Sequence, residues 1–476
     1  MLSIKTAKEV FDNFYKISQI PRASGNEKHI SNFLKQFAED LNLEVYQDSF
    51  YNLIIKKPGS FGLENSPSLI IQGHLDMVCV KNSDSLHDFE EDPIELIVDE
   101  DFIKAKSTTL GADNGIAVSM CMALLESNTI AHPPLEIVLT TQEEIGMIGA
   151  ENLDFSKLTA KRMINLDSPI ENSITCGSAA SSRLDYSIPI IREVAKDDAV
   201  FYQIKISGLI GGHSGGDIDK KRGNAMRIMG ELLKTIEKAS GFRIICISGG
   251  AKVNAIPREC VAIFAVSSES IDIVRRLLEK SISLTKGAFN IIDPGLEINF
   301  DQTDKTNYVL TRETSLRVIS SLLMIPNGII SMCADTKELI AVSNNIGVIE
   351  TYENDIKITT MIRGATDEFV AHAEEQIHAL ADMIGANVEF SQKNNAWPYK
   401  SGSEMLKALI ACHDKKPNIT VVHMGLECGI FSSNLQGIDI VSYGPNIFDL
   451  HTPLERISIS STGRVWEILK CLFKVL

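Results

Sequence analysis

Apolar strand-like segments alternate with an apolar helix-like segment in the first part of the chain, and this alternation constrains the fold most. Residues 68–78, 135–144 and 162–167 contain the aliphatic runs of buried strands, whereas residues 115–126 are typical of a helix. Strands separated by helices favour an α/β domain with a largely parallel sheet. In such open sheets, ligands bind at the carboxyl ends of the strands. The ends of these segments are therefore the first candidates for a binding site.

The sequence pattern changes near residue 184 and returns near residue 388. Residues 185–387 contain long strand candidates separated by helix candidates, which predicts a separate α+β domain. After residue 388, short apolar segments and a final helix resemble the first part again. We therefore predict one domain made of residues 1–184 and 388–476, into which a second domain, residues 185–387, is inserted.

Charge and cysteine usage exclude several classes of function. The 476 residues include 46 Lys and Arg against 62 Asp and Glu, a formal net charge of −16. This excess of acid argues against nucleic acid and against an anionic membrane surface as partners. The start lacks a signal-peptide core, and no apolar run approaches the roughly 20 residues of a bilayer span. The nine cysteines have no CxxC spacing, so we expect a cytoplasmic protein without a disulfide framework.

A helix start is predicted at Ser24–Glu27, whose sequence SGNE fits a capping box. Apolar residues then recur at helical spacing from Ile30 to Leu41. In a capping box the two side chains bond the backbone of the first helical turn.

Ionisable residues interrupt or follow the strand candidates. His74 and Asp76 are two residues apart in the apolar run LIIQGHLDMVCV, so on a strand both point to the same face. Burying an unpaired carboxylate costs several kcal/mol or more, so this pair needs partners. Further candidates lie just after strands, in a Gly-bounded loop or late in the chain: Asp113, Glu143, Glu144, Asp167 and His451.

Together these imidazole and carboxylate donors suit zinc or a similar divalent ion. An aspartate can bridge two ions roughly 3.5–4 Å apart that hold a shared water, and a remaining acid would take the proton of that water. Each residue also has an ordinary structural explanation. His74 can be a hydrogen-bonded core histidine, Asp113 a helix N-cap, and the paired glutamates Glu143 and Glu144 solvated loop acids.

A series of motifs extends from about residue 20 to residue 455: GHLDMV, LGADNGIAV, TTQEEIGMIGA, INLDS, GLIGGHSGGDI, NAIPRE, HMGLECGIF and HTPLE. In this order they resemble the aminoacyl-histidine dipeptidases, part of a larger family of two-zinc peptidases that includes glutamate carboxypeptidases and aminoacylases. The resemblance implies a zinc-peptidase catalytic domain with a central, mostly parallel mixed sheet flanked by helices. It also implies that the inserted α+β domain is a lid.

The resemblance implies a site for two divalent metal ions, most naturally zinc, with cobalt or manganese as substitutes. His74 and Asp167 would bind one ion, Glu144 and His451 the other, and Asp113 would bridge them.

The resemblance also implies roles in the reaction. Glu143 would be the general base, and Asp76 would orient His74. His213 of the inserted domain would stabilise the oxyanion that forms during the reaction.

Three residues would contact the substrate. Asn254 and Arg363 would hold its terminal carboxylate, since an arginine fork pairs with a carboxylate through two hydrogen bonds. Glu427 would lie near its amino end, although a surface loop acid is the competing interpretation. Members of the family commonly have a cis peptide bond after the bridging aspartate, here Asp113–Asn114.

The implied activity is hydrolysis of dipeptides of the Xaa-His type, β-alanyl-histidine among them, by a water between the two ions. An N-acyl amino acid deacylase or carboxypeptidase of the same fold is the alternative, because the metal centre cleaves an amide in every case. A catalytically inactive metal- or peptide-binding homologue is the second alternative. The expected partners are small peptide substrates. A homodimer and a monomer, in which the long lid fills the space of a partner's lid, both remain open.

Overall fold

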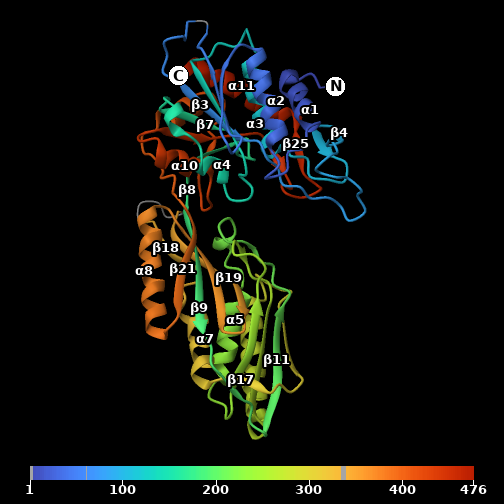
Figure 1. Cartoon of the computed structure of the whole chain (residues 1–476), viewed down its shortest axis with the longest axis vertical. Helices are drawn as coiled ribbons and strands as arrows, with labels where there is room; N and C mark the ends of the chain where they lie inside the picture. Colours follow the sequence, from blue (N-terminus) through green and yellow to red (C-terminus); the bar gives the residue numbers. More distant parts are fainter. Residues whose placement is uncertain (1–3, 61, 334–338) are drawn as a thin grey trace. The chain divides into compact units, whose positions relative to one another are not determined.

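The computed structural model describes residues 4–60, 62–333 and 339–476 (Figure 1). The chain forms two compact units, each with its own sheet and hydrophobic core. Unit 1 consists of Met1–Ser178, Trp397–Val421 and Leu426–Leu476, and unit 2 of Ala179–Ala396 and Val422–Gly425.

The predicted domain boundaries at residues 184 and 387 differ from the junctions of these units. Strand β9 (Ala180–Pro189) already pairs within the sheet of unit 2, and β21 (Asn387–Asn394) is the edge strand beside it. The change of pattern near residues 184 and 388 therefore falls inside or beside these strands and not at the junctions. The return of Val422–Gly425 to unit 2 has no sequence signal at all.

Unit 1 contains a mixed sheet whose central strands β6, β3, β7 and β23 run parallel. Antiparallel strands β1, β2 and β8 continue the sheet on either side of this centre. A smaller sheet has the order β24-β25-β5-β4. The strands of the large sheet, in spatial order, are β1 (Glu44–Gln47), β2 (Leu53–Lys57), β6 (Leu135–Thr140), β3 (Leu69–His74), β7 (Arg162–Asn165), β23 (Asp439–Ser442), β8 (Ser173–Ser178) and β22 (Asn418–Val422). Those of the small sheet are β24 (Ile447–Phe448), β25 (Arg456–Ser458), β5 (Phe102–Ala105) and β4 (Leu96–Asp99).

Helix α3 (Ala112–Glu126) forms the centre of the core of unit 1. Nearly all of its residues are buried, because it packs against both α1 (Lys8–Ser18) and β3. A helix that is apolar on every side needs such complete cover. Strand β3 is likewise buried along its whole length, as its aliphatic run predicts. The other helices are α2 (Lys28–Asp40), α4 (Ile148–Glu151), α9 (Glu404–Ala411), α10 (Glu427–Asn434) and α11 (Ile459–Val475), with a short 3₁₀ turn at Phe155–Lys157.

Unit 2 contains an antiparallel sheet of order β16-β11-β15-β13-β19-β20-β9-β21, with β18 paired to β19. Its helices pack with this sheet in a second core. The predicted α/β and α+β architectures are therefore confirmed. The strands are β9 and β21, given above, and β10 (Arg192–Val194), β11 (Ala199–Ser207), β12 (Gly212–His213), β13 (Arg243–Gly249), β14 (Ala255–Ile256), β15 (Cys260–Ser267), β16 (Glu297–Gln302), β17 (Tyr308–Leu310), β18 (Gly328–Met332), β19 (Ile340–Thr351) and β20 (Asp355–Gly364). The helices are α5 (Ala225–Ile236), α6 (Ile271–Phe289), α7 (Arg312–Met324) and α8 (Asp367–Ile384), with 3₁₀ turns at Ile218–Lys220 and Ser268–Ser270.

The predicted capping box at Ser24–Glu27 is wrong. Helix α2 begins at Lys28 without a side-chain cap. The Ser24 hydroxyl instead donates to Asp76, and the Glu27 carboxylate accepts the backbone N–H of Gln142. Oε1 of Glu27 also accepts the N–H of Gly25 at 2.9 Å. A tertiary contact therefore uses the side chain of Ser24, and that of Glu27 is shared between a local and a tertiary contact.

Among the described residues, no helix combines the length and the apolar character that crossing a membrane requires.

Candidate metal centre

Neighbouring parallel strands of unit 1 end at the same edge of the sheet. His74 closes β3 and pairs with Thr140 at the end of β6, while Gln72 pairs with Asn165 at the end of β7. The acids that follow these strands are therefore brought to one edge: Glu143, Glu144 and Asp167.

The two carboxylate oxygens of Asp113 face two different histidines. Oδ1 lies 3.2 Å from Nε2 of His74, and Oδ2 lies 3.2 Å from Nε2 of His451. On the His74 side, Asp167 Oδ1 lies 3.8 Å from the same Nε2 atom. On the His451 side, Glu144 Oε1 lies 3.0 Å from Nε2. The predicted ligands thus meet as two groups that share Asp113, although their roles as ligands stay predictions.

The loop before α3 holds Asp113 in place. The peptide bond Asp113–Asn114 is cis, as predicted. The Asn114 side chain accepts the N–H of His74 at 3.2 Å and donates to the carbonyl of Leu166 at 2.9 Å. Gly73 makes this possible, because a Cβ there would lie 2.4 Å from Asn114 Oδ1. Asn114 therefore ties the ends of β3 and β7 to the loop that carries Asp113.

Asp76 contacts both His74 and the loop that carries the paired glutamates. Its carboxylate accepts the N–H of Glu143 at 3.1 Å, the N–H of Glu144 at 3.2 Å and the hydroxyl of Ser24 at 2.8 Å. Nδ1 of His74 lies 3.1 Å from the Asp76 carbonyl and 3.4 Å from its Oδ1. Burial opposes ionisation of Asp76, but these interactions outweigh it and lower its pKa. With Nδ1 so engaged, Nε2 of His74 is the atom available to a ligand.

Buried and half-buried acids crowd the centre of this site. Burial, reinforced by Glu427 and other neighbouring acids, raises the pKa of Glu143 to about 8. Burial also raises the pKa of Glu427 to about 7 and, together with the charge of Asp113, raises that of Asp167 well above its ordinary value. Oε2 of Glu427 accepts hydrogen bonds from Gln72 and Thr140, whereas its buried Oε1 has no hydrogen-bond partner among the described residues.

This arrangement fits divalent cations. One ligand atom each from His74, Asp113 and Glu144 lies within 4.8 Å of the others, which is the spacing of a coordination sphere. Hydrogen bonds to Asp113 and Glu144 raise the pKa of His451 to about 10, so the acids attract positive charge strongly. Mixed oxygen and imidazole donors are those that zinc and similar ions accept.

His213 of unit 2 is set up as a neutral hydrogen-bond donor. Its Nδ1 accepts the N–H groups of Gly215 at 3.3 Å and Gly216 at 3.1 Å, so the ring proton is placed on Nε2. Burial, with the nearby charge of Arg363, lowers the pKa of His213 to about 4. The ring is therefore neutral near pH 7 and can donate from Nε2.

Arg363, also in unit 2, is a buried cation. Only 6% of its surface is exposed, and no carboxylate among the described residues forms an ion pair with it. Its hydrogen bonds are long ones to Ser214 Oγ, at 3.4 and 3.5 Å, and burial lowers its pKa to about 10. A buried guanidinium in this condition fits an anionic ligand. Asn254 contributes its carbonyl, which accepts the N–H of Ser214 at 2.8 Å.

A second histidine, His423, belongs to the same cluster of unit 2. Its Nε2 lies 2.7 Å from the hydroxyl of Ser343, which pairs with Arg363 across strands β19 and β20. Burial and the charge of Arg363 lower the pKa of His423 to about 3. The motif HMGLECGIF contains this residue, but its return to unit 2 could not be inferred from the sequence.

We expect acid to destabilise unit 2 through these two histidines. Their pKa values in the folded state, about 4 for His213 and about 3 for His423, lie below the ordinary 6.5. The unfolded chain therefore binds more protons below about pH 6.5, and stability falls as the pH is lowered through that window towards pH 4. Thermal unfolding at several pH values will measure this. The His213→Gln, His423→Gln double variant should lose less stability between pH 7 and 5 than the parent, and equal losses would contradict the assignment.

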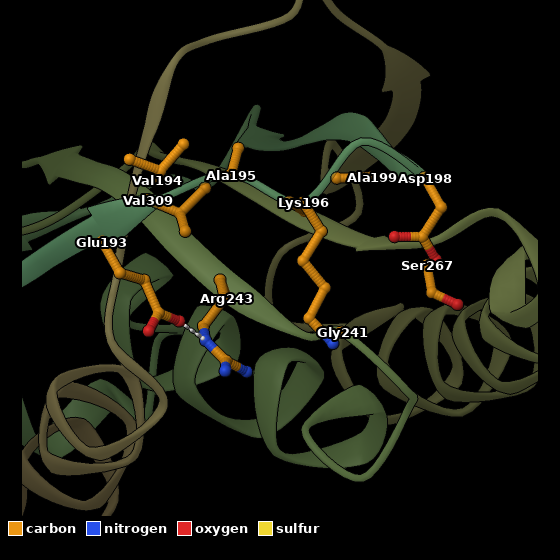
Figure 2. A pocket seen from close by; sticks show the side chains of 11 residues that line it. Glu193, Val194, Ala195, Lys196, Asp198, Ala199, Gly241, Arg243, Ser267 and Val309 are labelled. Atoms are coloured by element: carbon orange, nitrogen blue, oxygen red, sulfur yellow. Dashed lines mark hydrogen bonds and ion pairs between the residues drawn. The ribbon is translucent and has the colours of Figure 1, made fainter.

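A small cavity elsewhere in unit 2 does not suit a substrate (Figure 2). Its volume of about 20 Å³ is roughly the space that one water molecule needs. An ion pair between Glu193 and Arg243 forms part of its wall. None of the predicted site residues lines it.

Residues 204–286 match the peptidase dimerisation domain of the M20 family. The chain is 33% identical to the cytosol non-specific dipeptidase of Escherichia coli (strain K12), covering 99% of this chain and 98% of that protein. The crystal structure of the aminoacylhistidine dipeptidase from Vibrio alginolyticus superimposes with a TM-score of 0.90 at 32% identity, covering 100% of this chain and 97% of that one. The aminopeptidase PepT from Bacillus cereus, 15% identical with a TM-score of 0.57 over 99% of both chains, shares the fold.

These matches confirm the family resemblance that the ordered motifs indicate. Identity of 33% extends over almost the whole of both sequences, and the structural match is equally complete. The chain therefore belongs to the dipeptidase family of the M20 peptidases.

Proposed function

We propose that the protein is a metallopeptidase that hydrolyses dipeptides, with a preference for the Xaa-His type, using two divalent ions that are zinc in the native enzyme. The single observation that carries this proposal is the two-sided position of Asp113, 3.2 Å from both His74 and His451. The names of its relatives from Escherichia coli and Vibrio alginolyticus support the substrate class.

The residues of the chain divide the reaction between them. Two divalent ions would be held by His74 and Asp167 and by Glu144 and His451, with Asp113 shared, and would supply polarisation of the scissile carbonyl and a more acidic water. Glu143 takes a proton from the attacking water and passes it to the leaving amine as the C–N bond breaks. No hydrogen bond or ion pair engages its carboxylate within the described part of the chain, which leaves it available.

Further residues bind the substrate and the charge that develops on it. The Nε2–H of His213 donates to the oxyanion. Arg363, which forms no ion pair with an acid in the described part of the chain, pairs with the substrate carboxylate. Asn254 supports this cluster through Ser214. Oε1 of Glu427, which no described residue hydrogen-bonds, accepts a hydrogen bond from the substrate amino group.

A substrate panel tests the proposal. Purified protein loaded with zinc should release free histidine from Xaa-His dipeptides, lose this activity with a chelator and regain it when zinc is restored. Release of amino acids from N-acyl amino acids alone would favour a deacylase instead. Absence of hydrolysis with every substrate, despite bound metal, would indicate an inactive homologue.

We expect Asp76→Asn to retain metal and to lose activity. In the parent, the two oxygens of Asp76 accept the N–H groups of Glu143 and Glu144. The asparagine amide has only one oxygen, so its NH₂ group would face one of these N–H donors. Changes of such supporting residues typically cost roughly 10–100-fold in activity or metal affinity. Metal content and kcat will be measured beside Asp439→Asn, a buried acid that accepts N–H groups at the start of α9. Equal kcat for parent and Asp76→Asn would contradict the supporting role.

We also propose that the protein is a cytoplasmic homodimer. The match of residues 204–286 to a peptidase dimerisation domain supports the dimer, and the cytosol dipeptidase relative supports the compartment. Light scattering of the purified protein measures the oligomeric state directly.

A further inference from the structure

Glu455 is a buried acid whose carboxylate is bound entirely by the backbone of a distant segment. It lies four residues after His451 and is 2% exposed. Oε2 accepts the N–H of Leu110 at 2.8 Å and that of Gly111 at 3.0 Å. Oε1 accepts the N–H of Ala112 at 2.9 Å and that of Asp113 at 3.3 Å. Four donors thus converge on one carboxylate.

Three of these donors, the N–H groups of Gly111, Ala112 and Asp113, lie at the start of α3, where the backbone at Asp113 is not yet helical. The first N–H groups of a helix have no partner within it and form its positive end. The N-cap residue, Gly111, has no side chain to offer and adopts a φ of 69°. Glu455 supplies the missing acceptor and the favourable charge from more than 340 residues away.

The carbonyl side of the same loop is held as well. Arg22, 3% exposed, donates to the carbonyl of Gly111 and, at 2.9 Å, to that of Leu75, beside His74. The loop before Asp113 is therefore fixed through both its N–H and its carbonyl groups. A shift of the Glu455 carboxylate would therefore shift this loop, and with it Asp113.

The segment that carries His451 needs an attachment of this kind. His451 has a φ of 61° and Asp449 a φ of 52°, in the left-handed region that residues with side chains rarely adopt. Such conformations persist only where surrounding contacts impose them. The N–H of Glu455 donates to the carbonyl of Thr452 at 3.1 Å, so the turn and the buried carboxylate form one unit.

We propose that Glu455 is a positioning residue that joins the segment of His451 to the segment of Asp113 and so sets the spacing between the ligands of the metal centre. The inference rests on the proposed function, since it concerns the same site. It concerns how the shared aspartate and the histidine of one ion are held at the 3.2 Å separation seen in the structure.

The test is Glu455→Gln. A glutamine retains the shape but has one oxygen, so its NH₂ group faces one of the two pairs of backbone donors. We expect the apparent zinc affinity, measured by competition with a chromogenic chelator, to fall roughly 10–100-fold. Amide hydrogen exchange at residues 110–113 of the metal-free protein should become faster. In the zinc-saturated variant, kcat should fall while KM for an Xaa-His dipeptide stays near the parent value.

Glu136→Gln is the matched control. Glu136 is 4% exposed and also accepts backbone N–H groups, those of Thr159 and Ala160, but it lies at the opposite end of strand β6 from Thr140. The Glu136→Gln variant should be less stable than the parent but should bind zinc with parent affinity. Parent-like zinc affinity in Glu455→Gln, or an equal loss in both variants, would overturn the inference while the proposed function stands. A parent protein that binds no zinc would overturn both.

Discussion

Glu143→Gln is expected to lower kcat by roughly 10²–10⁴-fold while the metal content stays at the parent level. Glutamine fills the same volume but cannot accept the proton of the attacking water. The backbone N–H of Glu143, which bonds Asp76 at 3.1 Å, is unchanged by the substitution, so the loop and the neighbouring Glu144 should keep their positions. Steady-state kinetics with an Xaa-His dipeptide and elemental analysis of the same preparation measure both quantities.

Glu151→Gln is the control for this variant. Glu151 ends helix α4 on the surface of unit 1, a few residues after the paired glutamates, and should tolerate the change with parent-like kcat. A Glu143→Gln enzyme with more than about a tenth of the parent kcat would contradict the general-base role, because such a base typically contributes 10²-fold or more. Loss of the metal together with activity would instead indicate that Glu143 is a ligand.

Asp113→Ala is expected to abolish hydrolysis and to weaken the binding of both ions. The two oxygens of Asp113 face His74 and His451 separately, so each ion would lose a ligand. Removal of this carboxylate also takes away negative charge that attracts the cations. A calorimetric zinc titration of Asp113→Ala should show weaker binding at both sites. The same titration of His74→Ala should show weaker binding at one site.

Asp99→Ala provides the comparison for Asp113→Ala. Asp99 pairs with Lys104 at the surface of the small sheet, where such an ion pair contributes little to stability. Its zinc titration should match that of the parent. If Asp113→Ala still bound one ion with parent affinity, the aspartate would serve a single ion and the shared-ligand assignment would be wrong.

The location of the site could be predicted because strand ends can be recognised in the sequence. His74 and Asp167 end or follow strands that pair directly, and parallel pairing brings such residues to one edge. Asp113 and His451 are more than 300 residues apart, and only the resemblance of the motifs to a known family predicts that they meet.

Residues that hold the ligands could not be predicted, because their partners are defined only by the fold. Glu455 bonds to the backbone around Gly111, and backbone donors leave no trace in the sequence. Ser24 fits a helix cap equally well, yet its hydroxyl bonds to Asp76. Local patterns fail where a tertiary contact offers the same side chain a buried acceptor.

The measurement that tests the central claim most directly is a crystal structure of the zinc-loaded protein with anomalous data recorded at the zinc edge. The account predicts two peaks roughly 3.5–4 Å apart, one beside His74 and Asp167 and the other beside Glu144 and His451, with an oxygen of Asp113 on each. A single peak, or two peaks that do not share Asp113, would contradict it.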